Sequence, residues 1–534
     1  MIKKEIIKII ERCLKEFYKE EMDFSVEISD DKNHGDYSTN AALVLAKKLG
    51  KNSREVAEEI KNKIDDNKLF LKIEIAGPGF INFFISEQYL QAQILEIIRQ
   101  KEKFGALKIG KNQKINIDFI SANPTGPLTL GNGRGGFCGD VLANILKKAG
   151  YKVTREYYIN DTGAQIKKLG HSVIGDAEAV YKGEYIAELR KKLLEGRTFQ
   201  YSAQKVGERA ARFILEKMIK PSIRKMGIKF DVWFSEKSLY RKKEVDKAIK
   251  LLAKKGTTYS SEDAVWFRSK NIGDDKDRVL VRKDGIKTYF ASDIAHLLNR
   301  LKKGFGKLIF FWGADHYGYV ARMKAAFTAL GYGEERASFI IMQMVKLFKD
   351  GKEVRMSKRT GTYVTIDELV DEVGLDAARF FFLTRSSDTH LNFDMNLAKE
   401  QSVKNLVYYV QYAHARICAI LRKSSISKIS NPKAQSSPNL QFLKHENELA
   451  LIKQLIRLPE VVEDIAKDYQ VQRLPQYAVD LADSFHKFYE NCRVISEDKK
   501  LTQPRLALVL ATKITLKNTL DLMGVSSPEK MQSL

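Results

Sequence analysis

The chain has 534 residues, which at about 150 residues per domain predicts three or four domains. With 44% hydrophobic and 30% charged residues, and no apolar run near the roughly 18 residues that span a bilayer, the composition excludes a mostly disordered or membrane-spanning chain. Lysine and arginine total 91 against 67 acidic residues, and this net charge of +24 favours a polyanionic partner such as nucleic acid, although a solvated lysine-rich surface would carry the same charge.

Residues 1–106 have the pattern of a small α+β domain. Apolar residues recur at helical spacing from Ile6 to Leu14, and a second helix is predicted over residues 40–49, ended by Gly50. In LKIEIAGPGFINFFIS, apolar residues alternate on both sides of Gly-Pro-Gly, which predicts two strands joined by a turn.

Strands and helices alternate over residues 107–400. KINIDFI (114–120) predicts a strand, a glycine- and proline-rich loop and a helix follow, and YKVTREYYI (151–159) predicts the next strand. This βαβ unit predicts a Rossmann-like parallel sheet. LIFFWGADH (308–316) predicts a further strand, and the mixed segment from about 165 to 286 is expected to be an insertion.

Residues 401–534 are predicted to form a helical domain. An apolar stripe runs from Val403 to Ile420, and LALIKQLIRLPEVVEDIA and LALVLATKITLKNTLDLMG predict further helices. The segment 424–439, rich in serine, proline and lysine, is predicted to be a loop. The fold class is therefore multidomain α/β, with a parallel-sheet central domain between an α+β and an all-helical domain.

The loop SANPTGPLTLGNGRGG, after the first strand of this sheet, allows two interpretations. Gly131, Gly133 and Gly136 fit the dinucleotide-binding pattern, with Glu156 at the position of a ribose-binding acid, which suggests an oxidoreductase. In that fold the first glycine directly follows the strand, whereas here ten residues separate it from Ile120. Alternatively, the glycines let the backbone approach another ligand, and N–H groups at the helix start bind phosphate.

A second loop, KEVRMSKRTG (352–361), carries basic residues between two glycines. This composition suits a mobile loop that closes over a triphosphate and stabilises a departing pyrophosphate. An exposed basic turn is the simpler alternative.

Five stretches of the central domain together resemble the arginyl-tRNA synthetase family, within the class I aminoacyl-tRNA synthetases. They are IDFISANPTGPLTLGNGRGGFCGD, REYYINDTGAQI, TYFASDIAHLLNRL, WGADHYGYVARMKAA and VRMSKRTGTYVTIDELVDEVGLDAARFFFL. LVYYVQYAHARI and LDLMGVSSPEKM resemble the family's anticodon-binding domain. HGDYSTNAALVLAKKLG and IEIAGPGFINFFIS resemble its additional N-terminal tRNA-binding domain.

This resemblance implies a two-step reaction. Arginine attacks the α-phosphate of ATP, with Mg²⁺ assisting, to give arginyl-adenylate and pyrophosphate, and the arginyl group then passes to the 2′-hydroxyl of the terminal adenosine of tRNA(Arg). The resemblance also implies that bound tRNA promotes the first step and that the protein is a monomer. Phosphate chemistry of this type depends mainly on positioning and charge stabilisation.

The resemblance places ATP between two signatures. The family's His-x-Gly-His corresponds here to Thr129-Leu130-Gly131-Asn132, which keeps hydrogen-bond donors but lacks a side chain that becomes cationic. The implied catalytic residues are Thr129, Gly131, Asn132, Ser357 and Lys358. The implied ATP-binding residues are Gly126, Pro127, Thr129, Gly131, Asn132, Gly313, Met356, Ser357 and Lys358.

A planar guanidinium substrate requires a carboxylate that faces it in fork geometry. Asp293 is the expected partner, with Tyr289 four residues earlier on the same helical face, although a packed aromatic is the alternative for the tyrosine. Asp118 and Asn123 are implied to bind the substrate ammonium group. The expected arginine-binding residues are Asp118, Asn123, Tyr289, Asp293, Asp315 and His316, the last two at the end of a strand, where ligands of α/β folds bind. For His316 a contact with the ribose or with Trp312 stays open, and for Asp118 the alternative is a strand-edge carboxylate without a ligand.

Contacts with tRNA are expected from both ends of the chain. Aromatic side chains that stack on unpaired bases are a common means of RNA recognition, although tyrosines at helical spacing also pack in cores. The expected tRNA-binding residues are Asn33, His34, Tyr37, Tyr408, Tyr412 and Arg416.

No protein-bound metal site is expected, because the four cysteines lie far apart and the histidines show no metal-binding spacing. The N-terminal sequence MIKKEIIKII has no apolar core of a signal peptide, so we expect a reduced, cytoplasmic protein. Two other functions stay open: a tRNA-binding relative with weakened catalysis, because of the altered first signature, and a dinucleotide-dependent oxidoreductase.

Overall fold

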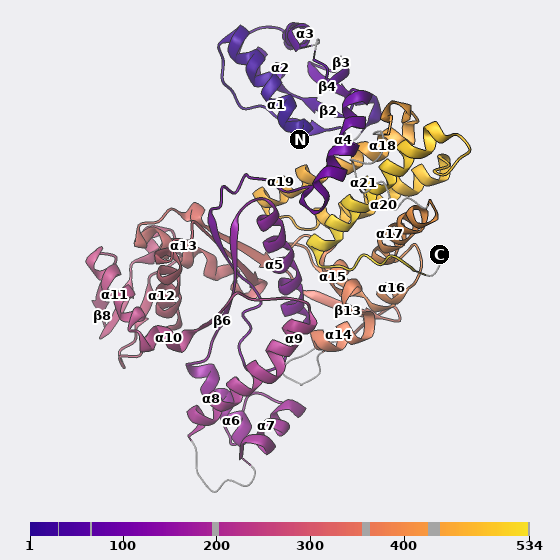
Figure 1. The fold of residues 1–534 in the computed structure, drawn as a ribbon. Helices are drawn as coiled ribbons and strands as arrows, with labels where there is room; N and C mark the ends of the chain where they lie inside the picture. The colour runs from indigo at the N-terminus through magenta and orange to yellow at the C-terminus, as the bar shows by residue number, and fades with distance from the viewer. Residues whose placement is uncertain (30, 65–66, 195–201, 355–363, 425–437, 532–534) are drawn as a thin grey trace.

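A computed structural model describes the chain in six segments. They are residues 1–29, 31–64, 67–194, 202–354, 364–424 and 438–531. Figure 1 shows an N-terminal unit, a central domain around a parallel sheet, and a C-terminal bundle of helices that contacts both.

The N-terminal unit has the predicted α+β character. Its antiparallel sheet has the order β1 (Val26–Ile28), β2 (Tyr37–Thr39), β4 (Phe80–Ile85) and β3 (Phe70–Ala76). Its helices are α1 (Ile2–Cys13), the π-helical turn η1 (Leu14–Tyr18), η2 (Lys32–His34), α2 (Ala41–Leu49) and α3 (Ser53–Ile64). The helix predicted over 40–49 is thus confirmed as α2, and Gly50 ends it with φ 65°, a conformation that glycine adopts without strain.

The central sheet has five strands, and all of its pairings are parallel. Their order is β12 (Ala337–Met342), β11 (Lys307–Gly313), β5 (Lys114–Asp118), β6 (Lys152–Ile159) and β7 (Val232–Ser235). Helices α5 (Leu130–Lys148), α12 (Tyr289–Lys302) and α13 (Val320–Leu330) pack on it. The βαβ prediction is confirmed.

Strand β11 is buried on both faces, as expected of a parallel strand covered by helices. Ile309 and Phe311 belong to the core that surrounds α5, whereas Leu308 and Phe310 belong to a second core around α12. The strand therefore holds these two helices on opposite sides of the sheet.

The segment expected as one insertion, about 165–286, contains a strand of the central sheet. Strand β7 lies within it and pairs with β6, which divides the segment into two parts. The helical part comprises α6 (Ala164–Ile174), α7 (Glu184–Leu194), α8 (Ala203–Ile214), η4 (Leu215–Ile219) and α9 (Lys220–Lys225). The second part comprises α10 (Glu236–Arg241), α11 (Glu244–Lys254), β8 (Thr258–Ser261), β9 (Ala264–Phe267) and β10 (Arg278–Val281).

The C-terminal part of the central domain forms a smaller sheet with helices beside it. Strand β13 (Val345–Lys349) pairs with β14 (Lys352–Val354) and β15 (Leu391–Asp394). The helices here are α14 (Ile366–Val373), α15 (Leu375–Leu383) and α16 (Met395–Lys399). Short 3₁₀ turns elsewhere are η3 (Lys101–Lys103), η5 (Ser269–Ile272), η6 (Ala314–Tyr319), η7 (Glu334–Arg336) and η8 (Leu440–Phe442).

The C-terminal domain is helical, as predicted. It comprises α17 (Leu406–Lys423), α18 (Glu446–Leu455), α19 (Leu458–Asp468), α20 (Arg473–Asn491) and α21 (Lys499–Met523). The apolar stripe begins later than predicted, because Val403 precedes the helix and is 58% exposed, and Leu406 is 37% exposed. Most of the predicted loop 424–439 lies outside the described residues.

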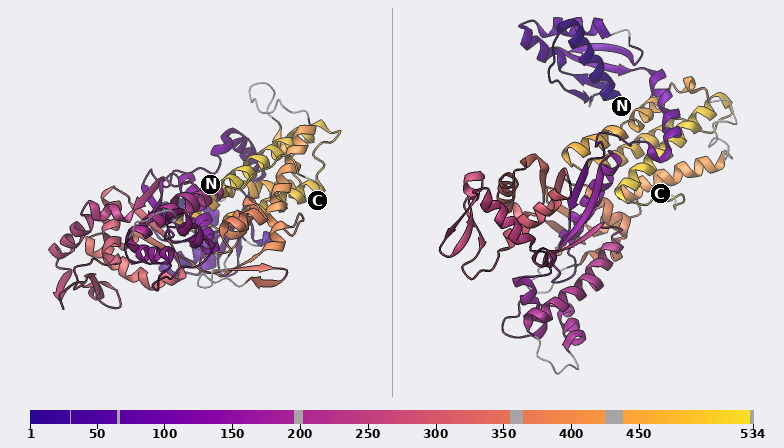
Figure 2. Two further views of the ribbon diagram at one scale, coloured as in Figure 1. Left: turned by 90° about the horizontal axis from the view of Figure 1, so that it is seen from below. Right: turned by 60° about the vertical axis from the view of Figure 1, so that its left-hand side comes forward.

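The N-terminal unit lies next to the C-terminal helices, as the right view of Figure 2 also shows. Helix α4 (Glu87–Gln100) packs against α18 and α21. Glu460 of α19 accepts hydrogen bonds from the backbone N–H of Lys3 at 3.0 Å and from the Tyr37 hydroxyl. The two ends of the chain therefore form one connected body.

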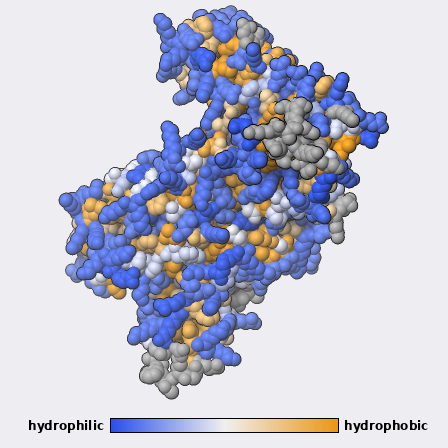
Figure 3. All heavy atoms as spheres, in the orientation of Figure 1, coloured by the Kyte–Doolittle hydropathy of each residue, from blue (hydrophilic) through white to orange (hydrophobic). Residues whose placement is uncertain are grey.

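Hydrophilic residues dominate the face of the molecule drawn in Figure 3, with apolar residues scattered between them. Within the described segments, no helix is long and apolar enough to cross a membrane.

Candidate functional site

A cleft of about 1010 Å³ lies at the carboxyl ends of the parallel strands. It is lined from the loop after β5, the start of α5, helix α12, and the residues after β11 and β12. Open α/β sheets bind their ligands at this edge. The predicted residues that line it are Asp118, Asn123, Gly126, Pro127, Thr129, Gly131, Asn132, Tyr289, Asp293, Gly313, Asp315 and His316.

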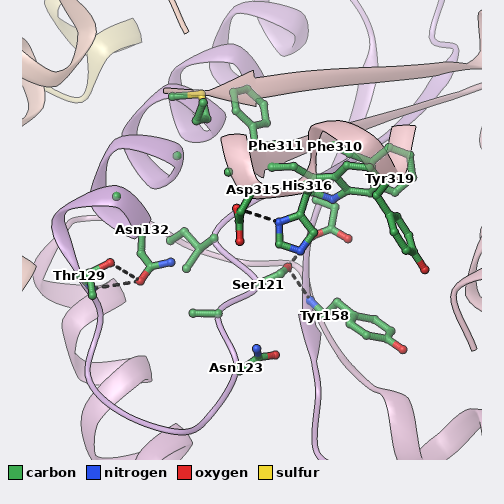
Figure 4. Close-up of a pocket in the computed structure, with 18 of the residues that line it drawn as sticks. Ser121, Asn123, Thr129, Asn132, Tyr158, Phe310, Phe311, Asp315, His316 and Tyr319 are labelled. Atoms are coloured by element: carbon green, nitrogen blue, oxygen red, sulfur yellow. Dashed lines mark hydrogen bonds and ion pairs between the residues drawn. The ribbon is translucent and has the colours of Figure 1, made fainter. Parts of the chain in front are cut away.

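The first turn of α5 presents Thr129 and Asn132 to the cleft (Figure 4). The backbone N–H and the hydroxyl of Thr129 both donate to Oδ1 of Asn132, at 3.0 and 2.9 Å. Because a backbone N–H only donates, this contact fixes the amide with its oxygen toward Thr129 and leaves Nδ2 to donate into the cleft. The unpaired N–H groups and positive dipole of the helix start favour an anion at this place.

The dinucleotide interpretation does not fit this geometry. A Cβ at Gly133 would lie 2.5 Å from Ile366, and one at Gly136 would lie 2.8 Å from Met226, so these glycines serve helix packing. Glu156 is only 1% exposed, and its carboxylate is occupied by buried partners. The sequence-based alternative of a ribose-binding acid at this position is therefore wrong.

A charge network of largely buried side chains forms part of the cleft wall, since Asp118, His296 and Arg300 all line the cleft. Arg300 donates to Glu156 at 2.9 Å and to Asp118 at 2.5 Å, and His296 contacts Glu156 at 2.7 Å. Burial alone would raise the pKa of Glu156, but the Arg300 guanidinium outweighs it and holds that pKa well below its usual range. Burial and the same guanidinium lower the pKa of His296 to about 4, so its imidazole is neutral.

Arg300 and His296 were missed at the level of sequence, although both lie on the predicted helix of Asp293. Asp118, predicted to bind the substrate ammonium group, is here paired with Arg300 and accepts a hydrogen bond from Ser121. It still lines the cleft.

Acidic groups gather on the α12 side of the cleft. Asp293 accepts a hydrogen bond from the Tyr319 hydroxyl, and burial, reinforced by the nearby Glu236, raises its pKa to about 8. Burial likewise raises the pKa of Glu236 to about 7, although Ser292 hydrogen-bonds it. One oxygen of Glu236, Oε2, is buried without a partner in the described part of the chain. A carboxyl group whose pKa is raised by burial beside a cleft, as for Asp293, is a candidate functional group.

The predicted partner Tyr289 is held by a chain of amides. Asn160 donates to the Tyr289 hydroxyl at 2.8 Å and to Oδ1 of Asn123 at 2.9 Å. The tyrosine is 51% exposed, so the alternative of a packed core aromatic is wrong. Asn160 was missed by the sequence analysis, and it links the loop after β5 to α12.

The residues after β11 line the cleft from the other side. His316 contacts Asp315 through Nδ1 at 3.0 Å, and their side chains are 54% and 80% exposed. Figure 4 shows both in the cleft opposite Asn132. Their exposure makes them suited to an open, solvated part of the site.

Three predicted residues, Met356, Ser357 and Lys358, lie outside the described residues. Where the described chain resumes, at residue 364, it contacts the first signature. Thr365 forms a β-bridge with Thr129, and the N–H of Ile366 donates to the carbonyl of Leu128 at 3.1 Å.

The predicted tRNA-binding residues differ in exposure. Asn33 and His34 are exposed on the N-terminal unit. Tyr37 is 4% exposed, and its hydroxyl bonds Glu460, so its prediction as a surface contact is wrong: it fastens the N-terminal unit to α19.

An aromatic cluster on α17 and α20 includes two of the predicted C-terminal residues. Arg416 donates to the hydroxyl of the buried Tyr412 at 2.6 Å and lies over the ring of Tyr489, which is 40% exposed and was not predicted. Tyr408 is half-buried on the same helix. Tyr489 is the exposed residue of this cluster, and Arg416 and Tyr408 are partly exposed.

No group of three or more metal-ligating side chains occurs among the described residues. The cleft does contain an exposed carboxylate, Asp315. Mg²⁺ commonly binds one or two carboxylates together with substrate phosphates and water, so this donor set fits an ion delivered with ATP.

The fold and the site define a class I aminoacyl-tRNA synthetase: a parallel sheet whose first helix starts with the altered signature, followed by a helical domain. Comparisons with known proteins specify it further. Residues 1–85 match the family described as arginyl tRNA synthetase N terminal domain, residues 93–420 match tRNA synthetases class I (R), catalytic domain, and residues 410–531 match the DALR anticodon binding domain.

Relatives and solved structures agree with these matches. An arginine–tRNA ligase of Carboxydothermus hydrogenoformans is 45% identical over 530 residues, covering 96% of this chain and 95% of the relative. A putative arginyl-tRNA synthetase structure from Campylobacter jejuni has a TM-score of 0.76 at 33% identity, covering 84% of this chain and 100% of that one. The Thermus thermophilus enzyme, at 22% identity and a TM-score of 0.82, covers 99% and 100% and supports the fold. The chain belongs to the arginyl-tRNA synthetase family.

Proposed function

We propose that this chain activates arginine with ATP and transfers it to the terminal adenosine of tRNA(Arg). The observation that carries the proposal is a single cleft with an anion-binding helix start on one side and a buried acidic pocket on the other. ATP phosphates are anionic and the arginine side chain is a forked cation, so the two halves match the two substrates.

The helix start acts on ATP in this proposal. Gly126, Pro127 and Gly131 let the phosphates approach the backbone, and Nδ2 of Asn132 donates to them. Thr129 orients that amide. Gly313 lies at the carboxyl end of β11, where it accommodates the nucleoside.

The acidic pocket acts on arginine. Asp293 lines the cleft and loses its proton when the guanidinium enters, because a cation next to a carboxyl group stabilises its ionised form. Tyr289 lies beside this pocket, while Asp118 and Asn123 face the α-ammonium group. This arrangement aims the carboxylate of arginine at the α-phosphate.

The remaining roles concern Met356, Ser357 and Lys358. In this proposal Lys358 stabilises the departing pyrophosphate. This role is supported by the described chain that follows this segment, in which Thr365 forms a β-bridge with Thr129 at the proposed phosphate site. Mg²⁺ would be held chiefly by the ATP phosphates with Asp315 nearby, and it supplies charge neutralisation there.

We infer that tRNA contacts both the exposed part of the N-terminal unit and the helical domain. Asn33 and His34 supply the first surface, and Arg416 with its aromatic neighbours supplies the second. The net charge of +24 favours this polyanion. We further infer a monomer that works in the cytoplasm.

Charging of purified tRNA with radiolabelled arginine tests the proposal. We expect charging that requires ATP, Mg²⁺ and tRNA(Arg), and that citrulline, the neutral isostere of arginine, does not support. Binding of tRNA without charging would instead identify the weakened relative. The Lys358→Ala variant should slow adenylate formation while tRNA affinity stays within about threefold, and equal losses of both would contradict its phosphate role.

A further inference from the structure

Arg134, in the second turn of α5, is fully buried yet carries a charge that the proposed reaction has not used. Its guanidinium donates three hydrogen bonds of 2.8 Å each, and all three acceptors are backbone carbonyls. A buried arginine held by carbonyls acts as a fixed fork that joins segments of chain.

The three carbonyls belong to two segments that lie beside each other. Gln343 connects β12 to β13, whereas Ser386 and Thr389 lie in the loop before β15. These segments also bond each other directly, because the N–H of Gln343 donates to the Ser387 carbonyl at 2.8 Å. Arg134 therefore clamps a unit of two segments to the helix whose first turn carries Asn132.

The clamped unit forms part of the cleft wall. Gln343 and Met344 line the cleft, and Met344 is 67% exposed. Strands β11 and β12 are parallel, and Met342 at the end of β12 pairs with Gly313 at the end of β11. Gln343 is therefore the first residue beyond the carboxyl edge of the sheet, where the nucleoside is proposed to lie. The acidic groups of the arginine half lie on α10, α12 and η6, elements that Arg134 does not contact through any of these bonds.

We propose that Arg134 is a positioning residue for ATP: by clamping the Gln343–Met344 wall to α5, it sets the width of the nucleotide half of the cleft. This inference rests on the proposed function for the identity of the nucleotide. Lysine at this position would keep the positive charge but not the clamp, because a single ammonium on a flexible chain lacks the rigid fork that bonds all three carbonyls. Loss of the clamp widens the nucleotide half and leaves the arginine half in place.

The test compares Arg134→Lys with the wild type in charging assays that vary ATP and arginine separately. We expect the KM for ATP to rise at least tenfold, while the KM for arginine stays within threefold. An unchanged KM for ATP, or a parallel rise of both KM values, would overturn the proposal. A purely structural role would lower thermal stability without this split.

Arg379 supplies a matched control. It is also buried, and it donates to the carbonyls of Met226 and Met523 and to Asp140, but it lies on α15 and does not line the cleft. Arg379→Lys should lower the melting temperature to a similar degree and leave the KM for ATP within threefold of the wild type. A tenfold rise in this variant as well would show that the effect on ATP is general destabilisation.

A second variant covers the case in which Arg134→Lys does not fold. Gln343→Gly loosens the same wall from its partly exposed side, and we expect the same split between the two KM values. No split in that variant would contradict the role of the wall. Calorimetric titration of ATP into the wild type and the variants distinguishes a failure of the Arg134 clamp from a failure of the proposed function. Weaker ATP binding in the variants supports the clamp even if the wild type does not charge tRNA. Equal ATP binding in the wild type and the variants overturns the clamp.

Discussion

Replacement of Asp293 by asparagine tests the arginine pocket most sharply. Removal of one partner from a buried ion pair costs about 3–5 kcal/mol. Asparagine keeps the shape and an acceptor for Tyr319, which favours the lower part of that range. With a pKa of about 8, Asp293 is protonated in roughly three-quarters of free molecules at pH 7.5, so ionising it on binding costs about 1 kcal/mol. The net loss is about 2–3 kcal/mol, or about 30- to 160-fold in kcat/KM for arginine.

The pH dependence provides the second half of this test. Below pH 8 the Asp293 carboxyl of the free protein takes up a proton, and a neutral acid attracts a guanidinium only weakly. The wild-type kcat/KM for arginine should therefore rise about tenfold per pH unit from pH 6 and level off above pH 8. The Asp293→Asn variant should lack this rise, because asparagine has no carboxyl group to ionise.

The assay is charging of tRNA at saturating ATP, with arginine varied at each pH. Asp263→Asn, on the exposed turn between β8 and β9, is the control for loss of one negative charge and should behave as wild type. A kcat/KM for Asp293→Asn within threefold of wild type, or an unaltered pH profile, would refute the assignment of the pocket.

Three further predictions address the surroundings of the cleft. Thr129→Val removes the hydrogen bond from the Thr129 hydroxyl to Asn132 and should raise the KM for ATP by about three- to tenfold. Thr129→Ser keeps a hydroxyl for this bond and should keep the wild-type KM for ATP. Equal effects of the two substitutions would contradict the orienting role of Thr129. Arg300→Met removes the cation that pairs with Asp118 in the buried charge network. The free energy of unfolding, measured by urea titration, should fall by about 3–5 kcal/mol. A loss below about 1 kcal/mol would contradict a strongly stabilising network. Gly170→Ala places a Cβ 1.7 Å from the carbonyl oxygen of Ala203 in α8 and should destabilise the protein by about 1–3 kcal/mol. A melting temperature equal to that of the wild type would contradict this close contact between the helices.

The elements that depend on local pattern were predictable from the sequence. The alternating apolar residues of β3 and β4 and the glycine after α2 appear where expected, because strand periodicity and helix ends are encoded by near neighbours. Strand β7 was not predicted, since all four of its residues are only partly buried and it becomes a strand through pairing with β6. Its place in the sheet is a tertiary property.

In the candidate site, too, residues in local motifs were predictable from the sequence, whereas residues that depend on tertiary contacts were not. The short motifs placed Asn132 and Asp293 correctly in one cleft. Arg300 resembles any solvated arginine near a helix end, and only the sheet brings Glu156 and Asp118 to it. Tyr37 was taken for a surface residue because its partner Glu460 is 423 positions away, a separation that no local pattern reveals.

The most direct measurement of the paired-substrate cleft is ATP–pyrophosphate exchange with arginine or citrulline, each with and without tRNA. Exchange that requires arginine, is absent with citrulline and increases when tRNA is added is the predicted result. Exchange that proceeds equally with citrulline, or no exchange under any of the four conditions, would contradict the pairing of an ATP site with a guanidinium pocket.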